Sequence, residues 1–529
     1  MSKQLKVNSV LKKYAKSLFF KMLFVCVIYG IMINEFLYNR ADGIWSGTYH
    51  LAGDWALSLG RWAIRYIDLA HFGISVYPLS AIITLLLFVL GTCFLVDLFN
   101  IEISSIWDYL ISGLFLANMI ICISISYLYT SSIFGLSFAT SSLCMWFVSK
   151  GVKGIADFRS LRKVNVFASL LGASVCVVIV LGAYQAYLGC LALMALLYLV
   201  YLVNHGFSFA YIRNYFLGGA VSGIIGFAIY EMILKIELSR YGVEMSSYNG
   251  ANSLSVRNIV SHLPSSMKRA YEIFLNYLVG KGSRWNLFAG NHMLIVFLAM
   301  CLVYVVLVFM IRKKILRTVI CLFSMILIPV AANIVVILIP DSQYLGQQTA
   351  PCALGFPIII CILARQLSEL HLIQIKKVCK MVVVAISVII MWGSIYQVQI
   401  DQEAMRQGVN TARTISSSIL VKLYDEDLYS TERRYAIIGS PCNNPMVCLN
   451  EIYFKSNPYA RVSGAYWGTS LDSRTWGGIF KNLLGINLPR CSDAEYERLL
   501  TNQRVTDMPL FPAKESIQEI DGVVVIRVS

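Results

Sequence analysis

Charged and aromatic side chains gather between two apolar segments of the chain, over residues 34–68. The carboxylates, guanidinium groups and indoles of this segment include those of Asp42, Asp54, Arg40, Arg61, Arg65, Trp45 and Trp62. A carboxylate can take the proton of an attacking hydroxyl, and a guanidinium matches the oxygens of a phosphate. The combination fits a site for a charged or sugar-bearing ligand where a membrane face meets water. A solvated loop with tryptophans at the membrane surface is the alternative.

The second half of this segment has helical spacing. Its aromatic and apolar residues predict one helix lying along the membrane surface, with a face made of Trp55, Leu59, Trp62 and Tyr66. In such a helix Arg61 and Arg65 lie one turn apart on the neighbouring face. Helix capping is the structural alternative for Asp54, and an Asp-Gly turn is the alternative for Asp42.

Two further polar clusters lie far from this segment in the sequence. "LGAYQAYLG" places Tyr184, Gln185 and Tyr187 in a short connection between apolar runs. The second cluster is "IPDSQYLGQQ", in which Asp341 is the first polar residue. Hydroxyl and amide groups of this kind can bind sugar hydroxyls, although short turns also need polar caps. We expect all three clusters to reach the same side of a membrane.

The elements that must position these residues are membrane spans. The 529 residues are 57% hydrophobic and 14% charged, which excludes an ordinary soluble enzyme. Apolar windows predict eleven transmembrane helices, each long enough to cross a hydrocarbon layer of ~30 Å. They lie at about 18–37, 75–96, 106–126, 128–148, 164–183, 186–203, 216–236, 291–311, 318–339, 352–366 and 379–398.

Charge placement predicts the orientation of these spans. Basic residues cluster in the N-terminal segment and in the loops near residues 155, 314 and 372, which places these on the cytoplasmic side. The first outer loop (38–74), a second outer loop (237–290) and the C-terminus then lie outside. The net charge of +15 belongs to the membrane part, where anionic lipids explain it, so nucleic acid is excluded as a partner.

The chain changes character after residue 398. Residues 1–398 form the predicted transmembrane catalytic domain, and 399–529 a small extracytoplasmic α/β domain. "RYAIIGSP" and "IDGVVVIRVS" predict strands, and Ser492 and Glu495 have capping-box spacing. Cys442 and Cys448, with Cys491 nearby, are candidates for one disulfide; unpaired thiols are the alternative.

Several motifs together resemble one known family. "YNRADG", "GRW" at residues 60–62, the "AYQA" turn, the eleven-span layout and the closing "MPLFP...IDGVVVIRV" are similar to the bacterial glucosyltransferase II family. Its members are polytopic enzymes that decorate O-antigen and related surface polysaccharides and look like GT-C glycosyltransferases. The sequence departs from the relatives at Gly43, where they often carry a second acid directly after the first. That leaves the second acidic role to Asp54 or to no residue.

The resemblance implies transfer of a hexose, glucose by analogy, from a polyprenyl-phosphate donor to a surface polysaccharide outside the bacterial cytoplasmic membrane. Asp42 is then the general base of an inverting displacement. Arg61, backed by Arg40 and Arg65, stabilises the leaving phosphate. The residues expected to contact the sugar or the acceptor are Tyr184, Gln185, Tyr187, Trp45, Trp62 and Asp341.

Other functions compete with this interpretation. A flippase or transporter of lipid-linked sugars predicts ionisable groups at mid-bilayer and matching halves. Few candidates are found, since Glu231 lies near the outer end of the seventh span, and no halves match. A membrane acyltransferase needs a buried catalytic histidine, and His205 has no acid near it in the sequence. No His or Cys spacing indicates a metal site, and no cofactor is predicted, although the outer acids leave a requirement for Mg²⁺ or Mn²⁺ open.

Overall fold

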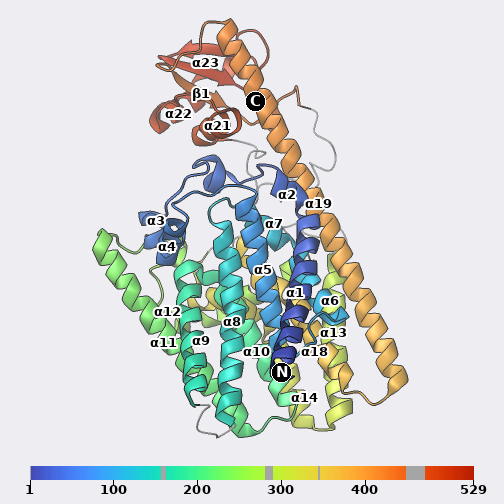
Figure 1. Cartoon of the computed structure of the whole chain (residues 1–529). Helices are drawn as coiled ribbons and strands as arrows, with labels where there is room; N and C mark the ends of the chain where they lie inside the picture. The colour runs from blue at the N-terminus through green and yellow to red at the C-terminus, as the bar shows by residue number, and fades with distance from the viewer. Residues whose placement is uncertain (1, 157–162, 280–289, 343–345, 448–470) are drawn as a thin grey trace.

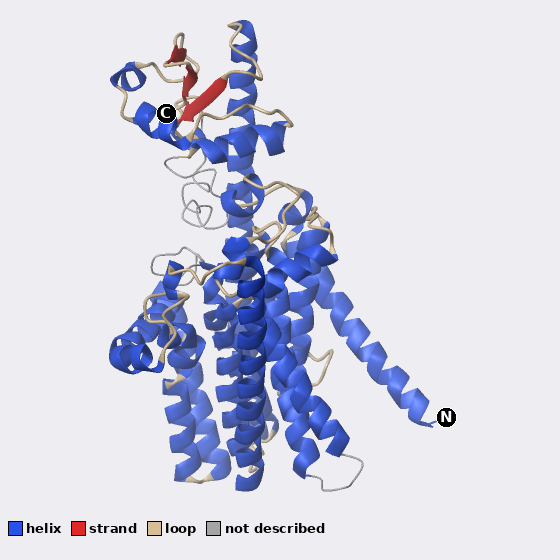
Figure 2. Cartoon of the chain, turned by 90° about the vertical axis from the view of Figure 1, so that its left-hand side faces the viewer, coloured by secondary structure: helices blue, strands red, loops and turns tan. Residues whose placement is uncertain are grey.

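The chain folds into a long bundle of helices with a smaller α/β region at one end, as seen in a computed structural model (Figure 1). The structure describes residues 2–156, 163–279, 290–342, 346–447 and 471–529. Strands occur only beyond residue 433 among these residues, and the rest of the fold is helical (Figure 2). We call the face of the bundle that carries this α/β region the tail side.

Eight helices of the described residues are long and apolar enough to cross a bilayer, so the chain has the composition of a membrane protein. A ninth span is added if the pair α6 (Ile106–Leu116) and α7 (Met119–Ile125), bent by 55°, counts as one. The eight contain α5 (Leu79–Leu98), α8 (Ser131–Ala156), α9 (Lys163–Ala183), η3 (Gln185–Tyr187) with α10 (Leu188–Asn204), α11 (Phe209–Tyr241), α13 (Gly290–Arg312), η5 (Gly346–Thr349) with α17 (Ala350–Ala353) and α18 (Gly355–Ser368), and α19 (Ile373–Asp425).

Two of the eleven predicted spans do not form such helices. The segment 18–37 falls on α1 (Ser2–Ile28) and α2 (Gly30–Asn34), with a break at Tyr29. The segment 318–339 is divided among α14 (Ile315–Ile326), α15 (Ile328–Ala332) and α16 (Ile334–Leu338). Hydropathy detects apolar composition but not these breaks, because backbone groups freed at a break can be satisfied by neighbouring helices.

Side chains of α19 satisfy the break between α1 and α2. The amides of Gln399 and Gln402 both donate to the carbonyl of Ile28, and the backbone N–H of Met32 donates to Gln402 Oε1 at 3.2 Å. Residues of α19 thus replace the hydrogen bonds that the broken helix lacks. Polar residues just after the last predicted span therefore hold the first one in place.

The helix α19 runs without interruption from the bundle into the α/β region (Figure 1). Its 53 residues correspond to a length of about 80 Å. The predicted domain boundary at residue 398 falls inside this helix. The helix continues past residue 398 because no helix-breaking residue stands at that boundary.

The region beyond α19 is built on a small sheet. β1 (Arg434–Ile438) pairs in parallel with β3 (Val523–Arg527), and β2 (Ile517–Ile520) pairs antiparallel with the other edge of β3. The short helices of this region are η6 (Pro441–Asn443), α21 (Ser473–Ile479), η8 (Phe480–Leu484), α22 (Asp493–Leu500) and α23 (Gln503–Asp507). The two predicted strands and the Ser492–Glu495 capping box are confirmed.

The predicted outer loops contain helices that hydropathy did not reveal. Residues 38–74 form η1 (Arg40–Ile44), α3 (Asp54–Ser58) and α4 (Trp62–Ala70). Residues 237–290 contain the end of α11, the turn η4 (Tyr248–Gly250) and the amphipathic α12 (Val256–Val279), although we expected a loop there. Charged and polar residues on one face of α12 lower its mean hydropathy below that of a span.

A buried ion pair lies at the end of the bundle away from the tail. Lys21 Nζ of α1 is 2.6 Å from Asp108 Oδ1 of α6, and both side chains are at most 2% exposed. Asp108 Oδ2 also accepts from Ser17 Oγ at 2.6 Å and from the N–H of Ser104 at 2.9 Å. Two charges out of water at this site depend on each other, because neither has solvent to replace its partner.

We expect Asp108→Asn to lower the stability of the purified protein by about 3–5 kcal/mol, since it leaves the Lys21 ammonium buried without a counter-charge. Thermal unfolding in detergent measures the loss as a fall in apparent Tm. Lys268→Gln is the control, because the Lys268–Glu272 pair is exposed and contributes less than ~1 kcal/mol. Equal Tm values for the two variants would contradict the expectation.

Candidate active site

A sharp turn separates α3 from α4 and places Arg61 at its end. Gly60 has φ +75°, a conformation that favours glycine, and an added Cβ would lie 2.4 Å from the hydroxyl of Tyr230. The carbonyl of Leu59 accepts from Gln185 Nε2 at 3.0 Å, and that of Gly60 accepts from the Tyr230 hydroxyl at 3.2 Å. The prediction of one helix over residues 54–68 is therefore wrong, because tertiary partners on η3 and α11 hold the chain in a turn.

The turn directs the Arg61 guanidinium over an aromatic ring. Its Cζ lies 4.6 Å from the ring centroid of Tyr184, a cation–π arrangement. Tyr184 is 2% exposed, and the side chains of Gln347 and Gln348 hydrogen-bond to its hydroxyl. No carboxylate of the described residues lies within ion-pair distance of Arg61, whose Nε is buried without a hydrogen-bond acceptor. The guanidinium is therefore available to an anion.

Arg61 lines a cavity of about 1010 Å³ between α9, α10, α11 and α16. The polar lining groups come from all three predicted clusters, with Arg61 from the first, Gln185 from the second and Gln348 from the third. Asn249 and Asn252, from the loop between α11 and α12, complete this polar end. Residues that are distant in the sequence thus share one cavity wall.

The remainder of the cavity has a mostly apolar lining, with Glu231 and Lys235 of α11 as its charged residues. Its lining follows one face of α11 from Gly223 through Phe227 and Leu234 to Leu238, a distance of about 22 Å along the helix. Val177 and Leu181 of α9 line it beside α11. That length along the helix exceeds half the thickness of a ~30 Å hydrocarbon layer. The shape suits a ligand whose polar group lies on the tail side of the bundle and whose long apolar chain extends along α11.

Asp42 is buried in η1, beside the N-terminus of α8. Its side chain is 4% exposed, and its two carboxylate oxygens accept from the N–H groups of Tyr129 (2.9 Å) and Thr130 (3.2 Å). Burial raises the pKa of Asp42 to about 7, while these hydrogen bonds lower it and the nearby charge of Asp68 raises it. A carboxyl group with such a pKa is suited to proton transfer near neutral pH.

Tyr127 is close enough to both Asp42 and Arg61 for their charges to act on its hydroxyl. Burial is the main cause that raises the pKa of the Tyr127 hydroxyl; the negative charge of Asp42 raises it further, and the positive charge of Arg61 lowers it. Both charges therefore act on the same phenol. Neither Asp42 nor Tyr127 lines the cavity described above.

The acids of the first loop differ in their surroundings. Asp54 is exposed in the first turn of α3, with Gly53 as the N-cap. Asp68 is fully buried, accepts from the N–H of Ala52 at 2.8 Å, and has a pKa raised to about 6, chiefly by burial. The second buried acid near Asp42 is thus Asp68, which sequence reasoning treated only as one charge of the loop.

Other predicted site residues point away from the cavity. Arg65 lies over the ring of Tyr241 at 4.1 Å, Trp62 packs on Gly182 of α9, and Trp45 turns toward α21. Tyr187 is fully buried below Tyr184, and Asp341 is exposed near Gly250.

Three predicted residues have side chains outside the part that the structure describes. They are Arg40, Cys442 and Cys448; the backbone of Arg40 lies in η1, and Cys448 lies wholly outside the described residues. Cys491 is buried. Among the described residues, no three His, Cys, Asp or Glu side chains lie close enough together to hold a metal ion.

Sequence reasoning missed several residues of this site. Tyr230, Glu231 and Lys235 line the cavity from α11, in a segment that carries no recognisable motif. The polar run "MSSYNGANSLS" was the available signal for the loop that supplies Asn249 and Asn252. Trp55 of α3 packs on Tyr248 of this loop at 5.1 Å between ring centroids.

Comparison with known proteins gives one match. A family described as Glucosyl transferase GtrII matches residues 46–359, more than half of the chain. The matched range contains Arg61, Gln185 and Gln348 and begins just after Asp42. No curated protein and no solved structure matches the chain.

The raised pKa of Asp42 gives a pH dependence with a definite sign. Between about pH 4 and 7 the folded state holds a proton that the unfolded state has lost, so stability falls as pH rises through this range. We expect Asp42→Asn to remove this part of the decline, by up to ~1.4 kcal/mol for each pH unit. Apparent Tm measured from pH 4 to 8 tests this. Asp54→Asn, at an exposed acid, should keep the wild-type profile, and parallel curves for wild type and Asp42→Asn would contradict the assignment.

Proposed function

Because the chain belongs to the GtrII glucosyl transferase family and is thus a glycosyltransferase acting on surface polysaccharide, we propose that its donor is a polyprenyl-phosphate sugar. The observation that carries this proposal is the Arg61 guanidinium, which lies over Tyr184 at the polar end of a long, mostly apolar cavity and has no carboxylate partner among the residues that the structure describes. A sugar linked through phosphate to a long isoprenoid combines an anion with an apolar chain. The cavity offers a cation for the phosphate and an apolar wall for the isoprenoid chain.

The donor phosphate binds at Arg61 and the isoprenoid follows α11 into the bilayer. A guanidinium can make two parallel hydrogen bonds to phosphate oxygens, and its interaction strengthens where water is excluded. The amides of Gln185, Asn249 and Gln348 surround the space next to Arg61 and hydrogen-bond the hexose hydroxyls. Glucose is the hexose that the family name supports.

Asp42 acts as the general base. An acceptor hydroxyl bound beside Tyr127 loses its proton to the Asp42 carboxylate as its oxygen bonds to the anomeric carbon. The bond from that carbon to the phosphate oxygen breaks, and its electron pair leaves with the polyprenyl phosphate. Arg61 stabilises the charge that grows on this leaving group. Attack opposite the phosphate inverts the anomeric configuration.

The reaction takes place on the exported side of the bacterial cytoplasmic membrane, where the O-antigen or a related polysaccharide is the acceptor. The basic loops at the opposite end of the bundle support this orientation, since positively charged loops stay in the cytoplasm. The tail side then faces the exterior together with the α/β region.

The direct test supplies the purified enzyme with radiolabelled polyprenyl-phosphate glucose and candidate O-polysaccharides. We expect label in the polysaccharide, and Arg61→Ala should lower kcat/KM for the donor by about 10²–10³. Arg65→Ala is the matched control, because Arg65 lies on Tyr241 and does not line the cavity. Equal losses in the two variants would exclude Arg61 as the phosphate ligand. Parallel reactions with a chelator decide the metal requirement.

A separate expectation concerns the base. Asp42→Asn should lower kcat by about 10²–10⁴ while the KM for the donor stays close to wild type, because the donor cavity does not include Asp42. In the wild type kcat/KM should fall as pH drops below about 7, where Asp42 takes up its proton. Full activity of Asp42→Asn together with inactivity of Asp54→Asn would assign the base to Asp54 instead.

A further inference from the structure

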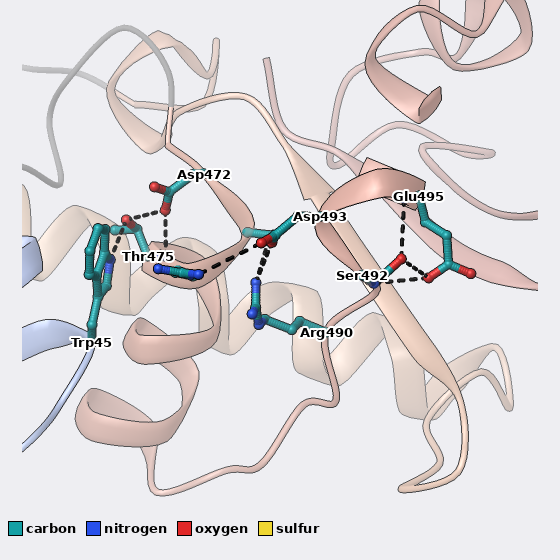
Figure 3. Close-up of polar contacts among 9 residues, drawn as sticks. Trp45, Asp472, Thr475, Arg490, Ser492, Asp493 and Glu495 are labelled. Atoms are coloured by element: carbon teal, nitrogen blue, oxygen red, sulfur yellow. Dashed lines mark hydrogen bonds and ion pairs between the residues drawn. The ribbon is translucent and has the colours of Figure 1, made fainter. Parts of the chain in front are cut away.

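The loop that carries Asp42 is also in contact with the α/β region, through α21 and η8. The Trp45 indole Nε1 donates to Thr475 Oγ1 at 3.0 Å, and Asn482 Nδ2 donates to the carbonyl of Ile44 at 2.5 Å. Figure 3 shows the Trp45 side chain reaching across to Thr475. These contacts lie two and three residues after Asp42 in the sequence.

Asp472 orients the Thr475 hydroxyl that accepts from Trp45. Asp472 caps α21, and its Oδ1 accepts from both the N–H (2.8 Å) and the hydroxyl (2.6 Å) of Thr475 (Figure 3). With its proton directed to Asp472, the hydroxyl presents a lone pair to the indole. The guanidinium of Arg474 lies 5.7 Å from the Trp45 ring centroid and adds a cation–π contact.

Backbone groups approach closely at the centre of this contact. A Cβ built on Gly478 would lie 2.2 Å from the carbonyl oxygen of Ile44, so only glycine fits there. Ile44 is fully buried under this helix. The neighbouring Gly477 has nothing within 4 Å of the same hypothetical atom. A side chain larger than glycine is therefore excluded at Gly478, whereas there is space for one at Gly477.

The other side of the Asp42 loop is held by the helix bundle. The N–H groups of Tyr129 and Thr130 bind the carboxylate, and the N–H of Leu128 donates to the carbonyl of Asp42 at 3.0 Å. The loop thus lies between the start of α8 and the α21–η8 segment. Its position depends on both, because a loop held on one side alone keeps its freedom on the other.

We propose that the α21–η8 segment is a positioning element for the Asp42 carboxylate, and that Thr475, Gly478 and Asn482 are positioning residues of the reaction. The inference rests on the proposed function of Asp42 as the base. The α/β region then contributes to the rate of transfer without touching the donor, since no residue of α21 or η8 lines the donor cavity. Small displacements of a reacting group are enough for this, because about 1 Å can cost ~10²-fold in rate.

The experiment compares Gly478→Ala with Gly477→Ala in the full-length enzyme. Both replace a glycine of the same helix by alanine, but only Gly478→Ala places an atom against Ile44. We expect Gly478→Ala to lower kcat by about 10²-fold with an unchanged donor KM, and Gly477→Ala to behave like the wild type. Thr475→Val should lower kcat in the same way, and Thr475→Ser, which keeps the hydroxyl, should restore it.

A second measurement reads the contact without the reaction. Hydrogen–deuterium exchange of residues 39–47 should increase in Gly478→Ala and Thr475→Val and stay unchanged in Gly477→Ala and Thr475→Ser. Unchanged exchange in all variants would overturn the contact itself. Increased exchange in a variant that keeps the wild-type kcat would overturn the positioning role. If the wild-type enzyme transfers no sugar but the variants still show increased exchange, the proposed function is overturned while the contact stands.

Discussion

The guanidinium of Arg61, which lies beside a mostly apolar cavity and has no carboxylate partner in the described part of the chain, is the feature on which the candidate site depends. A charge in such surroundings is costly unless a partner compensates it, and among the described residues Arg61 has the face of Tyr184 and no carboxylate. Its position follows from the turn at Gly60, where Gln185 and Tyr230 bind the carbonyls that a continuous helix would have used internally. Residues of η3 and α11 therefore hold the turn between α3 and α4, and the positive charge of Arg61 is available to a ligand.

The first loop is the meeting point of the two parts of the fold. At one end Arg61 faces the cavity along α11, and at the other end η1 holds Asp42 between α8 and α21. The charges of both groups act on the hydroxyl of Tyr127. The α/β region and the bundle thus have a shared boundary at the residues proposed to carry out transfer, and α19 ties the two parts together as one continuous helix.

Sequence reasoning found much of this site because its signals were local. The charged first loop, the "AYQA" turn and the Gln347–Gln348 cluster each stood out against apolar surroundings, and each contributes to the cavity or to Tyr184. It did not find Tyr127 or the burial of Asp68, because their importance lies in what packs around them. It also expected Trp45 and Trp62 at a sugar, whereas their contacts are Thr475 and Gly182, which no spacing along the chain could indicate.

The sequence by itself determined a membrane protein of a known glycosyltransferase family, since apolar run length and short motifs are properties of the linear chain. The strands and the capping box of the last hundred residues are local in the same sense. Only the tertiary structure decided where helices break, which arginine faces the cavity and how deeply Asp42 is buried. Those outcomes depend on hydrogen bonds and packing between residues that are far apart in the chain, such as Gln402 with Ile28 and Asn482 with Ile44.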